Sequence, residues 1–204
     1  MIGIIDYGMG NLGSIQNMLT RLGIESEITS DLDRIRAADK LILPGVGAFD
    51  KAMTNLQERG MISVLTELVL EEKKKFLGIC LGMQLISKRS EEGHLPGLGW
   101  IDADTVRFKF SEEHSLRIPH MGWNTVSIKK ESCLFKDMYE EPRFYFVHSY
   151  HVVCHSNETV LTSTNYGFDF TSGIENENIY GLQFHPEKSH KFGMKILRNF
   201  AELC

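Results

Sequence analysis

The chain has 204 residues, of which 42% are apolar and 24% charged, and its 12 Phe, 6 Tyr and 2 Trp are ample material for a core. These values exclude a disordered or collagen-like chain, and at about 150 residues per domain the length predicts one domain over residues 1–204. The formal net charge is −5 and the longest basic run is Lys73–Lys75, so binding of nucleic acid is not expected.

The first half of the chain alternates short apolar runs with helical patterns. Strands are predicted at 2–6, 24–28, 40–44 and 76–79. The apolar residues that mark helices after the first and third strands are Leu12, Ile15, Leu19 and Leu22, then Phe49, Met53 and Leu56, then Ile62, Leu65 and Val69. This alternation predicts an α/β fold with a mostly parallel central sheet flanked by helices.

Beyond Gly93 the chain changes to short extended segments separated by Gly and Pro, at 105–110, 124–128, 144–147, 160–164 and 179–184. We expect these segments to form additional antiparallel strands. The chain returns to a helix at its end, with Phe192, Ile196, Phe200 and Leu203 on one face.

Neither membrane insertion nor secretion is indicated by the sequence. The most apolar windows are broken by Pro, Gly, Glu or Gln well short of about 20 residues, and the N-terminus lacks a basic leader region. The four cysteines, at 80, 133, 154 and 204, form no CxxC pair and no dense disulfide pattern. This usage predicts reduced thiols and a cytoplasmic location.

The segment Gly78-Ile79-Cys80-Leu81-Gly82 has the pattern of a nucleophile elbow between a strand and a helix. Glycines two residues on either side relieve crowding at such a turn, so the central side chain can project from the carboxyl edge of the sheet. The helix N-terminus would then favour the thiolate form of Cys80. The alternative is a buried, unreactive cysteine in a glycine-flanked turn.

A cysteine nucleophile needs a base and a group that orients the base. His185-Pro186-Glu187 follows an apolar strand, and residues two apart in an extended chain point to the same side. His185 and Glu187 are therefore the candidate pair, although an ordinary surface turn would have the same sequence. Cys80 lies 105 residues away, so only the fold can bring the three together.

Two other motifs suggest different chemistry. His148, His151 and His155 lie close together, and His120 and His190 are also available, but their spacing is not that of a zinc site and no metal is expected. Residues 8–13 form a GxGxxG pattern after the first strand, and Asp31 follows 18 residues after Gly13. This pattern leaves open a dinucleotide-binding module as a distant alternative.

The motifs together resemble class I (triad) glutamine amidotransferases, and closely the glutaminase subunits of imidazole glycerol phosphate synthases. The cysteine elbow and His185-Pro186-Glu187 are shared across the class, whereas His120-Met121-Gly122-Trp123-Asn124 is specific to that subunit. The other matching segments are 4–11, 43–49, 77–85, 145–150 and 183–189.

The resemblance implies a role for each residue of the site. Cys80 would attack the glutamine amide, His185 would shuttle the proton and Glu187 would orient the imidazole. The oxyanion would be held by the backbone N–H groups of Leu81 and, after a rearrangement of the Gly45-Val46-Gly47 turn, of Val46. The implied glutamine-binding residues are Gly47, Gln84, Glu92, Ser149 and Tyr150, with Glu92 suited to the ammonium group. No cofactor is implied.

The resemblance also implies a partner, a (β/α)₈-barrel cyclase that uses the ammonia in histidine biosynthesis. Asn11, Trp123, Tyr145 and Lys188 match the family's interface positions, although Trp123 and Tyr145 could instead be core aromatics. Family members often carry Gln where this chain has His190, and segment 168–177 is undiagnostic. These features leave open a paralogous glutaminase that supplies a different barrel synthase, for example in the amidation of a surface sugar.

Overall fold

The structure is a computed structural model that describes residues 1–110 and 116–204. Its main sheet has the strand order β2-β1-β3-β4-β12-β11-β10-β7. The parallel part consists of β2 (Ser26–Thr29), β1 (Ile2–Ile5), β3 (Lys40–Gly45), β4 (Lys75–Cys80) and β12 (Ile179–Leu182). The prediction of a mostly parallel sheet formed by the first half is confirmed.

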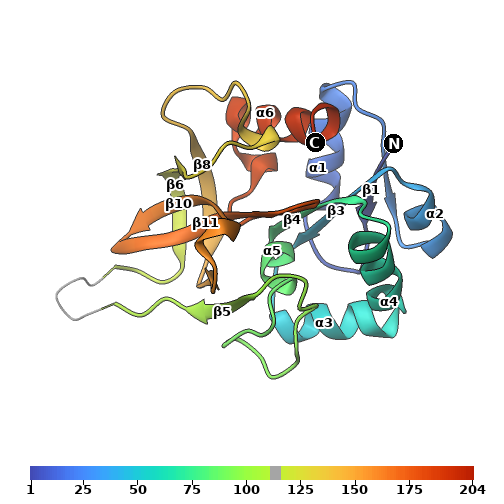
Figure 1. Cartoon of the computed structure of the whole chain (residues 1–204), viewed down its shortest axis with the longest axis horizontal. Coiled ribbons are helices and arrows are strands. Elements are labelled where there is room, and N and C mark those ends of the chain that lie inside the picture. Colours follow the sequence, from blue (N-terminus) through green and yellow to red (C-terminus); the bar gives the residue numbers. More distant parts are fainter. Residues whose placement is uncertain (111–115) are drawn as a thin grey trace.

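Helices cover both faces of this sheet (Figure 1). On one face lie α1 (Leu12–Arg21) and α6 (His190–Glu202), and on the other lie α2 (Leu32–Ala37), α3 (Phe49–Glu58), α4 (Met61–Thr66) and α5 (Leu81–Leu85). After α4 the chain continues through a π-helical turn at Glu67–Glu71. In the part of the chain that the structure describes, no helix is long and apolar enough to cross a membrane.

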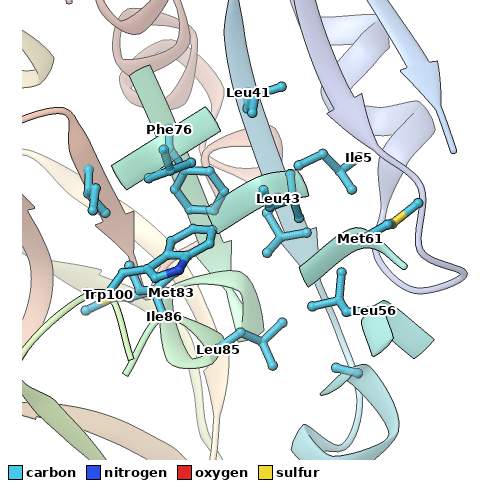
Figure 2. Close-up of a cluster of buried hydrophobic side chains, with 14 of the residues drawn as sticks. Ile5, Leu41, Leu43, Leu56, Met61, Phe76, Met83, Leu85, Ile86 and Trp100 are labelled. Carbon is cyan, nitrogen blue, oxygen red and sulfur yellow. The ribbon is translucent and has the colours of Figure 1, made fainter. Parts of the chain in front are cut away.

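The central strands are apolar on both sides because each face of the sheet is covered. In β3, Leu41 and Leu43 belong to one buried cluster and Ile42 to the other, as the two-residue period of a strand requires. Figure 2 shows the first cluster, in which the Phe76 ring meets the Trp100 indole edge-on with centroids 5.0 Å apart. The two clusters fix the position of β4, at the end of which Cys80 lies.

The second half extends the sheet with antiparallel strands. These are β11 (Phe168–Asn176), β10 (Val160–Tyr166), β7 (Ser127–Ile128), β9 (Tyr150–Cys154) and β5 (Ala103–Arg107). A separate antiparallel pair is formed by β6 (His120–Thr125) and β8 (Arg143–His148). Short 3₁₀ turns lie at Cys133–Phe135, Asn157–Thr159 and Pro186–Lys188.

The predicted elements differ from the structure in four details. Helix α2 and strands β9 and β11 were not predicted. Strand β12 pairs antiparallel with β11, as expected for the second half, but its other edge pairs parallel with β4, where Gly181 lies opposite Gly78. A short turn after Asn176 joins β11 to β12 as a hairpin. The parallel pairing with β4 involves residues about a hundred positions away, so the sequence of the strand itself does not report it.

The prediction that all four cysteines are reduced is also wrong. Cys133 and Cys204 form a disulfide across 71 residues, whereas Cys80 and Cys154 are free. The pair meets because the turn that contains Cys133 packs against α6. Asn199 of that helix donates hydrogen bonds to the carbonyl oxygens of Leu134 and Lys136. Only this packing, and not the spacing in sequence, brings the two sulfurs together.

Candidate active site

Cys80 is the last residue of β4 and has a left-handed backbone with φ of 54°, directly before α5. A non-glycine residue adopts such a φ only where its surroundings hold it there. The neighbouring glycines explain the tightness of the turn. A Cβ on Gly78 would lie 2.6 Å from the Gly82 carbonyl oxygen, and one on Gly82 would lie 1.8 Å from that of Leu43. The predicted elbow geometry is confirmed.

His185 and Glu187 are side by side, as their spacing predicts. His185 Nδ1 lies 2.7 Å from Glu187 Oε1, and both side chains are almost fully buried. The contact forms where the chain enters the 3₁₀ turn Pro186–Lys188, not within a continued strand, because β12 already ends at Leu182. Since the carboxylate can only accept, Nδ1 carries the proton and Nε2 is the free ring nitrogen.

That free nitrogen faces the cysteine. His185 Nε2 is buried and has no hydrogen-bond partner among the described residues. Burial opposes the charged imidazolium, but the adjacent Cys80 sulfur and the Glu187 carboxylate outweigh it and raise the pKa of His185 to about 10. The surroundings therefore favour His185 as the acceptor of the Cys80 proton, the transfer that activates a cysteine nucleophile.

Ser189 fixes the backbone that carries this histidine. Its hydroxyl donates to the His185 carbonyl at 2.6 Å and accepts from the Tyr145 N–H at 3.0 Å. The His185 N–H in turn donates to the Tyr145 carbonyl at 2.9 Å. The histidine is thus tied to β8 as well as to its own turn.

A pocket of about 300 Å³ opens beside Cys80. The residues that the family resemblance implies for glutamine binding all line it, namely Gly47, Gln84, Glu92, Ser149 and Tyr150. So do Val46 and Leu81, the residues implied for the oxyanion. Pro119, Val147 and His148 complete the lining. The volume and the mixture of polar and apolar walls suit a small amino-acid substrate.

The Gly45-Val46-Gly47 turn ends β3 at the mouth of this pocket. Gly47 has φ of 113°, and the Val46 side chain is 43% exposed. The Val46 N–H belongs to the Gly45–Val46 peptide, and the glycines on both sides of Val46 lower the steric cost of reorienting that peptide. The Tyr7 hydroxyl lies close to Gly45, so that a Cβ at this position would be only 2.5 Å from it. That hydroxyl is buried without a hydrogen-bond partner among the described residues, and burial together with the Cys80 charge raises the pKa of Tyr7.

The Glu92 side chain lines the pocket and is held in place by a backbone hydrogen bond. Its Oε2 accepts from the Phe49 N–H at 2.9 Å, at the start of α3. Burial raises the pKa of Glu92, the Phe49 N–H opposes that change, and the nearby Asp50 adds to it. A ligand ammonium group would relieve the cost of keeping this carboxylate charged.

Three of the four residues predicted to contact a partner gather on one surface. Trp123 is 46% exposed, the Lys188 ammonium lies 5.6 Å from the centre of the Tyr145 ring, and the Trp123 and His190 rings stack with centroids 5.4 Å apart. Trp123 is therefore not a core residue. Asn11 precedes α1, where it accepts a hydrogen bond from Ser14.

The histidines and the glycine-rich segment of the two alternative motifs make contacts within the protein. His120 Nδ1 and His148 Nε2 are 3.0 Å apart, so these nitrogens bind each other, and no cluster that could hold a metal occurs within residues 1–110 and 116–204. In the glycine-rich segment after β1, a Cβ on Gly10 would lie 3.1 Å from the Pro44 carbonyl oxygen. That glycine allows the segment to support the end of β3.

The glutamine amidotransferase class-I family matches residues 3–203 of the chain. The chain belongs to this family. Among curated proteins, this amidotransferase is 55% identical to the imidazole glycerol phosphate synthase subunit HisH 2 of Methanococcus maripaludis, over 99% of both chains. It is 50% identical, over the full length of both, to the protein of the same name from Pseudomonas aeruginosa.

Solved structures agree on the fold of the amidotransferase. A glutamine amidotransferase structure aligns with a TM-score of 0.71 at 20% identity and covers 98% of this chain and 97% of its own. The structure of PurLQS from Thermotoga maritima aligns with a TM-score of 0.73 at 16% identity, over 98% and 96% of the two chains. At these identities the likeness concerns the fold alone.

Two residues of the site were not predicted. Gln183 donates from Nε2 to the Cys80 sulfur at 3.7 Å, and His148 reaches the Tyr150 carbonyl through Nδ1 at 2.7 Å. Gln183 belongs to the segment that carries the family resemblance, but an amide before an aromatic residue suggests no chemistry by itself. His148 was considered only as a metal ligand.

Proposed function

We propose that this chain is the glutaminase subunit of an imidazole glycerol phosphate synthase, formed by residues 1–204 as one catalytic domain. Full-length identity to the two HisH 2 proteins supports the assignment. The observation that carries the chemistry is the buried His185–Glu187 pair, 2.7 Å apart, beside a cysteine held at positive φ.

The reaction begins with proton transfer from Cys80 to His185. The sulfur attacks the carboxamide carbon of glutamine, and the oxyanion that forms is stabilised by the N–H of Leu81 and, once the turn rotates, of Val46. His185 Nε2 then gives its proton to the departing nitrogen. The C–N bond breaks, ammonia leaves and a glutamyl thioester remains on Cys80.

Water completes the cycle. As the water attacks the thioester carbon, His185 takes one of its protons. The C–S bond then breaks, glutamate is released, and His185 returns the proton to the sulfur, which regenerates the free thiol. Glu187 keeps the imidazole in the tautomer that presents Nε2 throughout. Gly47, Gln84, Glu92, Ser149 and Tyr150 bind the rest of glutamine, with Glu92 on its ammonium group.

Free ammonia would be protonated and lost in water, so the proposal includes a (β/α)₈-barrel cyclase docked on the surface formed by Trp123, Tyr145 and Lys188, with Asn11. Exposure of the Trp123 indole supports this docking, since aromatic residues are enriched at interfaces. The glycines that flank Val46 ease reorientation of the Gly45–Val46 peptide, which carries the Val46 N–H. This supports activation by the partner, since the second oxyanion donor then depends on docking.

A second candidate is a paralogous glutaminase that serves another barrel synthase. Both HisH relatives described above carry the number 2 in their names. The catalytic chemistry would be the same, and only the barrel that activates the subunit would differ.

The test measures glutamate release by the subunit alone, with the cyclase barrel, and with the barrel plus its nucleotide ligand. We expect a rise of about 10²-fold on docking and ligand binding, the worth of one oxyanion donor. Cys80→Ala should abolish the glutamine-dependent reaction and leave ammonia-dependent turnover intact. Cys154→Ala, at the other free cysteine, is the matched control and should keep both.

Retained glutaminase activity in the Cys80→Ala complex would overturn the proposal. Equal rates in all three mixtures would disprove activation. Activation only by a barrel from another pathway would favour the second candidate.

A further inference from the structure

Gln183 lies at the junction of the sheet and the elbow, fully buried, directly after β12. Its backbone N–H donates to the Ser172 carbonyl at 2.9 Å, so the main chain is fixed by β11. Its side chain reaches away from that strand to two partners, the Gln84 amide in α5 and the Cys80 sulfur. The buried amide of Gln183 therefore lies between a residue of the pocket and the nucleophile.

The Tyr150 carbonyl oxygen determines which atom donates in each of these hydrogen bonds. Gln84 Nε2 lies 3.1 Å from the Tyr150 carbonyl oxygen, and because a carbonyl can only accept, the Gln84 NH₂ group must face it. The same NH₂ group is 3.0 Å from Gln183, so the atom that Gln183 presents there must be its oxygen. Gln183 therefore turns its own NH₂ group toward Cys80, with Nε2 and Sγ 3.7 Å apart.

We propose that Gln183 is a positioning residue for the nucleophile, which delivers an N–H to the Cys80 sulfur with its polarity set by Gln84 and the Tyr150 carbonyl. The inference rests on the proposed role of Cys80. A donor aimed at sulfur stabilises the negatively charged form more than the thiol. It acts again when the thioester is hydrolysed and the departing sulfur regains its charge.

Gln84 also lines the glutamine pocket. Both hydrogens of its NH₂ group are used by Tyr150 and Gln183, which leaves Gln84 Oε1 as an acceptor for the ligand. One side chain thus takes part in binding glutamine and in orienting the donor on the sulfur. A substitution at Gln84 should affect both functions, and one at Gln183 mainly the second.

The experiment follows alkylation of Cys80 by iodoacetamide as a function of pH. The full chain is used in a Cys154→Ala background, so that Cys80 is the remaining free thiol. Gln183→Met keeps the length of the side chain and removes the donor. We expect the midpoint of the pH profile to rise by about one unit and the rate at pH 7 to fall about 5- to 10-fold.

In the complex with its barrel, Gln183→Met should lower kcat for glutamine about 10-fold with little change in KM. Gln84→Met should shift the alkylation profile in the same direction and also raise KM. If Gln183→Met does not fold, Gln183→Glu keeps the acceptor toward Gln84 and should shift the profile further, because its carboxylate repels the sulfur.

The matched control is Asn199→Leu, which removes a buried amide of α6 that donates to the carbonyl oxygens of Leu134 and Lys136. It should lower the melting temperature and leave the alkylation profile unchanged. A folded Gln183→Met protein with the parent profile would overturn the inference while the proposed function stands. If a diazo analogue of glutamine fails to label Cys80 in the parent protein, the proposed function itself fails.

Discussion

The two ends of β4 open onto two very different hollows. At the amino end, a groove of about 1120 Å³ is lined by residues that include Lys75, Lys130 and the Cys133–Cys204 disulfide. At the carboxyl end, the pocket beside Cys80 measures only about 300 Å³. The larger hollow is the one without a nucleophile.

Local chemistry separates the two more sharply than size. In the groove, Lys130 donates to the carbonyl oxygens of Glu158 and Glu175, and the Lys75 ammonium lies 5.7 Å from the centre of the Tyr180 ring. In the pocket, Cys80 has a positive φ and His185 Nε2 lacks a hydrogen-bond partner among the described residues. The groove also has a residue at positive φ, Glu177, and a buried oxygen without a hydrogen-bond partner among the described residues, Glu175 Oε2. Of the two hollows, only the pocket combines such features with a free thiol and the His185–Glu187 pair.

The largest expected effect is at the carboxyl end. Glu187→Gln should lower kcat for glutamine hydrolysis about 10³-fold or more, because an amide does not hold the imidazole in the required tautomer. Steady-state glutamate release in the complex measures it. Glu175→Gln, in the amino-end groove, is the control and should change kcat by less than about twofold. Equal losses in both variants would remove the distinction between the two ends.

The next effect tests the crowding of the elbow. Gly82→Ala should lower the free energy of unfolding by about 3 kcal/mol or more, because the new Cβ would lie 1.8 Å from the Leu43 carbonyl oxygen. Urea denaturation measures it. Gly13→Ala in α1, where a Cβ meets nothing within 4 Å, should instead stabilise the protein by up to about 1 kcal/mol. A Gly82→Ala protein as stable as the parent would contradict the account of the elbow.

A substitution in the groove at the amino end of β4 should change the stability of the protein and not its activity. Cys133→Ser should lower the free energy of unfolding of the oxidised protein by about 2–4 kcal/mol, because the disulfide closes a long loop in the unfolded chain. Its kcat for glutamine should stay within about twofold. With dithiothreitol present, variant and parent should unfold at closely similar urea concentrations. A persistent difference under reduction would assign the loss to packing instead.

The smallest expected effect concerns His151 in β9, which lines neither hollow and packs its ring on Phe108. Burial lowers the pKa of His151 to about 4, against the opposing effects of the Val152 backbone and Glu91. Between pH 6.5 and 4 the unfolded chain binds a proton that the folded one does not, so this contribution to stability is complete above pH 6.5 and falls as the pH is lowered. The loss at pH 5 is about 2 kcal/mol.

His151→Phe removes this dependence. The ring packs on Phe108 with centroids 4.7 Å apart, and its Nδ1 has no hydrogen-bond partner among the described residues. The variant should be within about 1 kcal/mol of the parent at pH 7 and more stable than the parent at pH 5. Urea titrations at the two pH values measure it, and parallel losses in both proteins would show that other groups dominate acid unfolding.

The sequence by itself predicted the α/β class, the strands β1, β3 and β4, and the residues of the reactive end. These predictions depend on local patterns. Apolar runs bounded by glycine identify strands that are buried on both faces. Gly78 and Gly82 lie within two residues of Cys80, and the tight turn that positions Cys80 has no room for a Cβ at either glycine. The His185–Glu187 contact was equally local, since the two residues are separated only by Pro186.

Only the tertiary structure decided the features that depend on distant segments. Three features join residues that lie far apart in the chain: the parallel pairing of β12 with β4, the Cys133–Cys204 disulfide, and the hydrogen bonds that link Gln183 with Gln84 and Cys80. Their geometry is set by the packing of helices on the sheet, and no spacing in the sequence reports it. The Gln183 amide and the Cys133 thiol each have a role only because the fold brings Cys80 next to the one and Cys204 next to the other.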